Sequence, residues 1–166
     1  MHSSSVRPTD GLEEVLEQYG NMLFRYAFMM LGTSQDAEDV VQDTLLKYWQ
    51  KAPVFKDKSH EKAWMLTVTA NRCRDLLRSR MRHGEVPLES VAEIPDSTGE
   101  VIAESCILDA LLSLPEKYKS VLYLYYVEEY RVENIAGIIG KTSSAVKMRL
   151  KKGRELLKEV YRKEFM

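Results

Sequence analysis

Residues 130–154 read YRVENIAGIIGKTSSAVKMRLKKGR, and this stretch decides the fold. Its first half holds four apolar residues at helical spacing, which predicts a helix with one apolar face. These residues are Val132, Ile135, Ala136 and Ile139. Gly140 follows and supplies the residue that best tolerates a positive φ, as a sharp turn requires. The sequence therefore predicts a helix that ends in a tight turn.

A second helix is expected directly after this turn. Thr142 or Ser143 can cap its N-terminus, and Val146 and Leu150, four residues apart, face inward. Its remaining surface is crowded with cations, namely Lys147, Arg149, Lys151, Lys152 and Arg154. A helix, a short turn and a basic second helix form the helix-turn-helix arrangement, whose second helix enters the major groove of DNA.

The positive charge of this region is local. From residue 141 to residue 163 there are nine Lys or Arg and only two acids, whereas the whole chain carries a net charge of −1. Clustered cations on a nearly neutral protein favour contacts with phosphates. The plainer interpretation, a lysine-rich helix facing solvent beside an ordinary helical corner, stays open on this stretch alone.

Length and composition indicate a helical protein. A chain of 166 residues allows one domain or two small ones, helix formers dominate, and no alternating strand pattern persists, so the fold class is predicted to be all-α. No apolar run approaches the ~20 residues of a membrane span. Residues 1–10 lack the apolar core of a signal peptide and are expected to be a disordered tail. Cys73 and Cys106 are expected to be buried thiols in a cytoplasmic protein.

Two amphipathic helices are predicted in the first third of the chain. The apolar positions of the first are Leu12, Val15, Leu16, Tyr19, Leu23, Tyr26, Ala27 and Met30. Gly32 closes this helix, and Thr33 with Asp36 resembles a capping box that starts the second. The second helix spans residues 36–50, and its predicted inner face is Val40, Val41, Leu45 and Trp49.

The other side of the second helix carries Asp39, Gln42, Asp43 and Leu46, which lie three and four residues apart. They form either a solvated polar face or a docking surface for a basic or mixed partner helix. Spacing alone does not choose between these two interpretations.

A third helix is predicted over residues 63–82, after Pro53 and a connector that holds Lys56, Lys58 and Lys62. Its expected inner face is Trp64, Leu66, Val68, Ala70, Cys73, Leu76 and Leu77. Five arginines fall between residues 72 and 82, more than complementing the helix dipole requires. They indicate a second nucleic-acid surface, suited to an unstacked strand, on which Phe55 and Trp64 could stack unless they belong to the core.

From His83 to Glu104 the chain holds six acids, no Lys or Arg, and Pro87, Pro95 and Gly99, which predicts an acidic linker. It is either a simple tether or a polyanion that mimics a nucleic-acid strand. A helix is expected from Glu104, and the next is expected to begin at Pro115. The predicted inner face of that next helix is Val121, Leu122, Leu124, Tyr125 and Val127.

Nothing in the sequence indicates catalysis. We find no glycine-rich phosphate loop, no cluster with metal-ligand spacing and no pairing of nucleophile and base. His2, His60 and His83 fall in the tail, a loop and the linker. No catalytic residue, metal, cofactor or small-molecule substrate is therefore expected.

Four blocks of sequence together resemble the extracytoplasmic-function sigma factors of bacterial RNA polymerase, in the sigma-70 family. They are DAEDVVQDTLLKYW (36–49), AWMLTVTANRCRDLLR (63–78), LPEKYKSVL (114–122), and the helix-turn-helix pair IAGIIG (135–140) and AVKMRLKKGR (145–154). The third and fourth blocks alone would be shared with response-regulator output domains. All four in this order, with an acidic linker between the second and third, are specific to the sigma factors.

This resemblance implies two small helical domains. Residues 1–10 would be the tail, 11–82 region 2, 83–103 the acidic linker and 104–166 region 4. The implied function is to bind core RNA polymerase, direct it to specific promoters and assist promoter melting. The implied partners are the clamp helices and flap of the polymerase, promoter DNA, and an anti-sigma factor that could hold this cytoplasmic protein at the membrane without direct insertion.

The resemblance also implies site residues. Core polymerase would be bound by Asp39, Gln42, Asp43 and Leu46. The non-template strand of the minus-ten element would be held, with a flipped base, by Lys56, Lys58, Lys62, Asn71, Arg72, Asp75 and Arg78. The minus-thirty-five element would be contacted by Thr142, Ser143, Ser144, Lys147, Arg149, Lys151 and Lys152.

The chain departs from the family pattern at Asn134, where Glu is usual, at Lys141, where an apolar residue is usual, and at Gly153, where Ala is usual. Because Gly costs roughly 1 kcal/mol against Ala within a helix, we expect the second helix of the motif to fray or bend after Lys152. The rival interpretation is a stand-alone helix-turn-helix regulator, whose N-terminal half would be a dimerisation module and whose operator would be palindromic.

Overall fold

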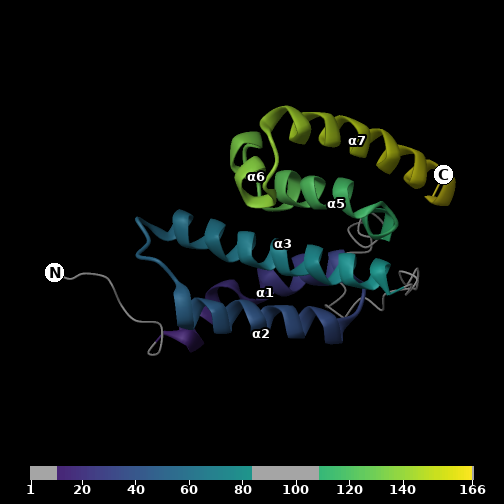
Figure 1. The fold of residues 1–166 in the computed structure, drawn as a ribbon. Helices are drawn as coiled ribbons and strands as arrows, with labels where there is room; N and C mark the ends of the chain where they lie inside the picture. Colours follow the sequence, from purple (N-terminus) through teal and green to yellow (C-terminus); the bar gives the residue numbers. More distant parts are fainter. Residues whose placement is uncertain (1–10, 84–108, 166) are drawn as a thin grey trace. The chain divides into compact units, whose positions relative to one another are not determined.

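The computed structural model describes residues 11–83 and 109–165, which are helical and contain no strand in those two ranges (Figure 1). The all-α prediction is confirmed. Contacts within the chain divide it into two compact units, Met1–Glu85 and Val86–Met166. The predicted tail, Cys106 and nearly all of the predicted acidic linker lie outside the described residues.

Unit 1 is a bundle of three helices in which each packs against the other two: α1 (Leu12–Leu31), α2 (Ser34–Lys51) and α3 (Lys58–Arg82). The corner between α1 and α2 follows the prediction. Gly32 adopts a φ of 88°, and its N–H donates to the Phe28 carbonyl. The Thr33 hydroxyl oxygen accepts the Asp36 N–H at 3.2 Å and so caps α2.

The inner face of α2 is partly different from the prediction. Its buried residues are Ala37, Val40, Val41, Thr44 and Tyr48. Trp49 was expected to face inward, but 44% of its surface is exposed, because Tyr48 occupies the inward position one residue earlier. Leu45 is only half-buried, and on α1 the predicted core residue Leu16 is 47% exposed.

Helix α3 begins five residues earlier than predicted. The Asp57 carboxylate accepts the His60 N–H at 2.8 Å, so Asp57 caps the helix and Lys58 is its first residue. Lys58 and Lys62 are therefore helical, not part of the connector. The buried residues of α3 are Met65, Leu66, Thr69, Ala70 and Cys73, whereas Trp64, Val68, Leu76 and Leu77 are half-buried.

Unit 2 contains α5 (Glu116–Leu122), the π-helical turn η2 (Tyr123–Val127), α6 (Val132–Ile139) and α7 (Ser143–Phe165). Pro115 caps α5, close to the predicted start. A π turn fits more residues than an α turn, so the register of the side chains shifts from Tyr123 onward. Tyr123 and Leu124 are buried, but Tyr125 and Val127, which were expected to face inward, are exposed.

The helix-turn-helix is present as predicted. Gly140 ends α6 with a φ of 71°, in the left-handed region that favours glycine. The Thr142 hydroxyl oxygen accepts the Ala145 N–H at 3.1 Å and caps α7. The buried residues of the motif are Ile135, Ala136, Ile138, Ile139, Val146 and Leu150.

The expected fraying after Lys152 is absent, because α7 continues without interruption to Phe165. Gly153 is buried where α7 packs against α5. A Cβ atom at this position would lie 3.1 Å from Cδ1 and 3.3 Å from Cγ of Leu122. The glycine therefore allows a close approach of the two helices, which compensates for its low helix propensity.

Substitutions at two helical glycines of unit 2 test this explanation. A Cβ at Gly137 in α6 would meet nothing within 4 Å, so we expect Gly137→Ala to raise the free energy of unfolding of unit 2 by about 0.5–1 kcal/mol. Gly153→Ala should gain less, because its Cβ presses on buried Leu122, and Gly153→Leu should cost about 1–3 kcal/mol. Hydrogen exchange of the α5 and α7 amides measures these changes. An equal gain for both alanine variants would contradict the close-approach explanation.

Candidate polymerase and promoter interfaces

The outer face of α2 carries all four residues predicted to bind polymerase. Asp39, Gln42, Asp43 and Leu46 are exposed, and 49% of the surface of Leu46 is accessible. Trp49 extends the same row three residues beyond Leu46. Two large apolar side chains thus continue an acidic and amide-bearing stripe, a combination typical of an interface with another protein.

One residue of this α2 face contacts a residue predicted to bind DNA. The Arg72 Nε atom donates to Asp43 Oδ2 at 2.8 Å, and both side chains are nearly half exposed. An ion pair with this exposure is worth about 0–1 kcal/mol. The pair therefore links the two predicted surfaces, and breaking it costs little free energy.

The outer face of α3 carries Asn71, Asp75 and Arg78, all exposed and spaced at four and three residues. Asn71 Oδ1 accepts a hydrogen bond from Arg74. Arg80 pairs with Asp36 at the start of α2. Some of the arginine excess noted in the sequence therefore ties α3 to α2 or to its own surface.

The three lysines in the connector and at the start of α3 differ in their contacts and exposure. Lys56 stays in the connector, where its N–H donates to His60 Nδ1 at 3.0 Å. The Lys58 ammonium donates to Gln18 Oε1 of α1 at 3.0 Å, although the side chain is 75% exposed. Lys62 is half-buried. The connector and the first turn of α3 thus form one segment, which hydrogen bonds hold together and join to α1.

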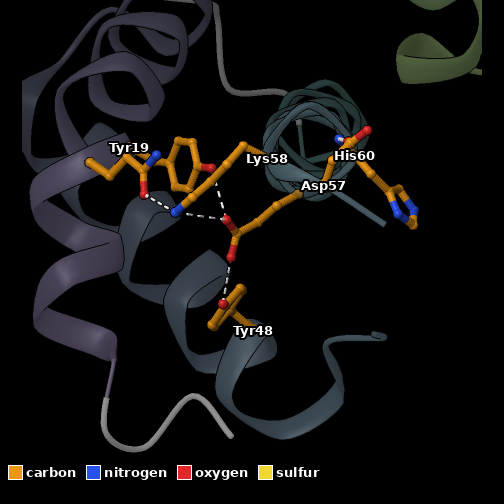
Figure 2. Close-up of polar contacts among 7 residues, drawn as sticks. Tyr19, Tyr48, Asp57, Lys58 and His60 are labelled. Atoms are coloured by element: carbon orange, nitrogen blue, oxygen red, sulfur yellow. Dashed lines mark hydrogen bonds and ion pairs between the residues drawn. The ribbon is translucent and has the colours of Figure 1, made fainter. Parts of the chain in front are cut away.

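Glu61 anchors this segment to the other two helices. Its side chain is 13% exposed, and its carboxylate accepts hydrogen bonds from the Tyr19 phenol of α1 at 2.8 Å and the Tyr48 phenol of α2 at 2.6 Å. Lys58 Nζ lies 4.0 Å from the same carboxylate (Figure 2). Burial raises the pKa of the Tyr48 phenol, and the hydrogen bond to Glu61 adds to the rise.

The aromatic residues of the connector region pack on one another. The ring centroid of Tyr48 lies 6.1 Å from that of Phe55 and 6.1 Å from that of Trp64, and Phe55 and Trp64 are 5.8 Å apart. Both Phe55 and Trp64 are half-buried. This favours the core interpretation of the two residues over stacking on bases.

Helix α7 gathers the residues predicted to contact the minus-thirty-five element. Ser144, Lys147, Lys151 and Lys152 are exposed, whereas Ser143 and Arg149 are half-buried. The Thr142 hydroxyl caps the helix, as described above. The resulting surface is mainly lysine, which binds phosphate as a point charge and lacks the two-pronged geometry of arginine.

Two further observations concern the described residues as a whole. Within them, no group of three or more His, Cys, Asp or Glu side chains is placed to hold a metal ion. Over the same ranges, no helix combines the length and the apolar character that crossing a membrane requires.

Both units match models of one protein family. The model of sigma-70 region 2 matches residues 15–83, and that of sigma-70 region 4 matches residues 104–157. The ECF RNA polymerase sigma factor SigL of Mycobacterium tuberculosis is 32% identical over 145 residues, which cover 84% of this chain and 82% of SigL. The chain belongs to the ECF sigma factors.

Other sigma factors agree with this assignment. SigM of Mycobacterium tuberculosis is 27% identical over 145 residues, covering 87% of this chain and 74% of SigM. Among solved structures, the sigma factor RpoE, in complex with the anti-sigma factor NepR from Bartonella quintana, matches with a TM-score of 0.76 and 28% identity. That match covers 92% of this chain and 97% of RpoE.

As an ECF sigma factor, the protein binds core RNA polymerase and directs it to promoter DNA at transcription initiation. The stand-alone regulator is not favoured, because the region 2 model covers the half of the chain that this rival would use for dimerisation. By family, sigma factors are initiation factors rather than enzymes.

Three features of this sigma factor were not predicted from the sequence. Trp49 on α2 and Met148 on α7 are exposed, although the first was assigned to the core and the second was not considered. The periodicity of Val146 and Leu150 places Met148 outward and could have revealed it. The role of Glu61 had no signal in the sequence, because its partners lie 42 and 13 residues away.

The Glu61 network gives a prediction for stability. We expect Glu61→Ala to lower the free energy of unfolding of unit 1 by about 2–4 kcal/mol, because it removes the acceptor of two phenol hydrogen bonds at a mostly buried site. Urea unfolding followed by tryptophan fluorescence measures this, since both tryptophans, Trp49 and Trp64, lie in unit 1. Glu38→Ala removes an exposed acid of α2 and should change stability by less than about 0.5 kcal/mol. Equal effects of the two variants would refute the anchoring role of Glu61.

Proposed function

We propose that the two units divide the work of promoter recognition. Residues 11–82 act as region 2, which engages polymerase and captures the opened minus-ten strand, and residues 104–166 act as region 4, which grips the minus-thirty-five duplex. Residues 83–103 join them, and residues 1–10 are a tail. RNA synthesis is carried out by the polymerase, and this chain supplies no catalytic residue, metal or cofactor.

The observation that carries this proposal is the outer face of α2. Asp39, Gln42 and Asp43 supply carboxylate and amide groups for a basic or mixed helix pair, such as the clamp helices of the largest polymerase subunit. Leu46 and Trp49 add apolar contact area, with exposed fractions of 49% and 44%. Exposed apolar side chains in line with polar partners are what a helix-on-helix interface uses.

In the proposed minus-ten site, α3 presents Asn71, Arg72, Asp75 and Arg78. Lys56, Lys58 and Lys62 lie on or just before its first turns. A base can be read there only after it leaves the stack, which costs a few kcal/mol. The Glu61 network supports this role, because a surface that is already ordered loses less conformational entropy on binding.

In the proposed minus-thirty-five site, α7 enters the major groove with its capped N-terminus leading. Ser143, Ser144 and Thr142 belong to the capped end, and Lys147, Arg149, Lys151 and Lys152 follow over the next turns. Most of these side chains suit phosphates better than base edges, so binding should depend strongly on salt.

We further propose that an anti-sigma factor regulates the protein. The complex of RpoE with NepR supports this, since RpoE is a relative over nearly the whole chain. Such a factor would cover the surfaces that meet the clamp helices and the flap of the polymerase. The protein would then be cytoplasmic, and would be held at the membrane only through a membrane-bound anti-sigma factor.

The polymerase face is tested with a double variant. We expect Asp39→Ala with Gln42→Ala to weaken binding to core RNA polymerase by at least about tenfold, because interface hot spots cost about 1–2 kcal/mol or more each on truncation. Competition with a labelled sigma factor for core polymerase measures the affinity. Glu17→Ala with Asn21→Ala removes an acid and an amide from the exposed side of α1 and is the matched control. Unchanged polymerase binding by the α2 variant would overturn the proposed docking face.

The duplex site is tested in the holoenzyme, since the free chain is expected to bind promoter duplex weakly. Lys147→Ala with Lys151→Ala should weaken promoter binding on the order of tenfold and reduce the salt slope by about 2, because two phosphate contacts are lost. Filter binding over a series of salt concentrations measures both. Lys158→Ala with Lys163→Ala removes the same charge further along α7 and should have a smaller effect. If the two pairs behave alike, the charge of α7 matters but the proposed contact site is wrong.

A further inference from the structure

One exposed apolar side chain stands in the middle of the basic surface of α7. Met148 is 71% exposed, although Val146 and Leu150 on either side of it in the sequence are buried. At 100° per residue, Met148 lies on the side of the helix opposite to Val146, Leu150 and Gly153, which pack inward. Met148 therefore projects directly away from the body of unit 2.

Cations surround this position. Lys147 precedes it, and Lys151 and Lys152 lie three and four residues later, all of them exposed. A duplex drawn to these charges would meet Met148 at the centre of the contact, not at its rim. A lone exposed methionine elsewhere on the surface would need no explanation, and it is this placement that distinguishes Met148.

Few residues around Met148 have side chains suited to contacting base edges. The exposed lysines provide point charges, which suit phosphates, and Arg149 lies to the side and is half-buried. On the outward side of the first two turns, this leaves Ser144 and Met148. Ser144 can bond several base edges, so it discriminates weakly. Sequence preference should therefore depend chiefly on the methionine.

A thioether side chain selects one group in the major groove. The C5-methyl of thymine is the apolar group that the base pairs present there, whereas the other bases present donors and acceptors. Those polar groups would lose water beside a side chain that cannot satisfy them. The flexible methionine can also adapt its shape to a methyl group whose position varies with DNA geometry.

We propose that Met148 is a specificity-determining residue that contacts the C5-methyl of a thymine in the minus-thirty-five element. This inference rests on the proposed entry of α7 into the major groove. It goes further by naming the base and the chemical group that are read.

The test begins with holoenzyme assembled from the full chain and core RNA polymerase. Duplexes with a randomised minus-thirty-five region are selected for binding, and each thymine of the enriched sequence is then replaced by deoxyuridine, which lacks only the methyl. We expect one of these replacements to weaken binding about fourfold, the equivalent of ~0.8 kcal/mol for one buried carbon group. The remaining replacements should have little effect.

Three variants decide the assignment, two at Met148 and one at Lys147 and Lys151 together. Met148→Ala should bind the thymine and deoxyuridine duplexes equally, within about twofold, whereas Met148→Leu should keep the difference because it keeps an apolar contact. An enriched sequence without thymine, a flat deoxyuridine scan, or a penalty that survives in Met148→Ala would each overturn the inference. If Lys147→Ala with Lys151→Ala also leaves binding unchanged, the proposed role of α7 fails as well, so the two failures can be told apart.

Discussion

The arrangement of unit 1 depends on the hydrogen bonds that the Glu61 carboxylate accepts from two other helices. Moving a carboxylate out of water is costly unless hydrogen bonds replace the lost hydration. Here, two phenols from different helices provide those bonds, at 2.8 and 2.6 Å. Burial and this hydrogen bond to Glu61 both raise the pKa of the Tyr48 phenol. The first turn of α3 is therefore fixed to α1 and α2 by one side chain, and the short connector between α2 and α3 is held at both ends.

This arrangement makes the outer faces of α2 and α3 parts of one surface. The Asp43–Arg72 pair joins a residue proposed for polymerase to a residue proposed for the opened strand. Because both side chains are nearly half exposed, exchanging this partner for a group on polymerase or a phosphate costs little. Assembly with polymerase can therefore change the partner of Arg72 without disturbing the core. The core is stabilised by buried groups such as the Thr44 and Thr69 hydroxyls, 3.0 Å apart.

Local signals in the sequence predicted local structure. The Gly32 and Gly140 ends, the Thr33 cap and the helices of the helix-turn-helix depend on a few consecutive residues, and all of them are confirmed. Several errors involve contacts between distant segments, whereas the start of α3 was predicted five residues too late although the Asp57 cap is a local signal. Periodicity could not choose between Tyr48 and Trp49, because Tyr48 turns inward to reach Glu61 on another helix. The π turn that exposes Tyr125 likewise had no local signal. The α2 and α7 site residues were predictable as surface residues, but their roles came from family resemblance.

Gly153 shows how packing on one side of a helix determines chemistry on the other. Its intrinsic helix propensity predicted a weak point, yet the missing Cβ allows α7 to approach Leu122 of α5 closely. That contact, together with buried Val146 and Leu150, fixes the rotation of α7 about its axis. The rotation in turn decides that Met148 points outward and that Arg149 lies to the side. In the proposed minus-thirty-five site, the packing of a buried glycine therefore helps determine which side chains of α7 face outward.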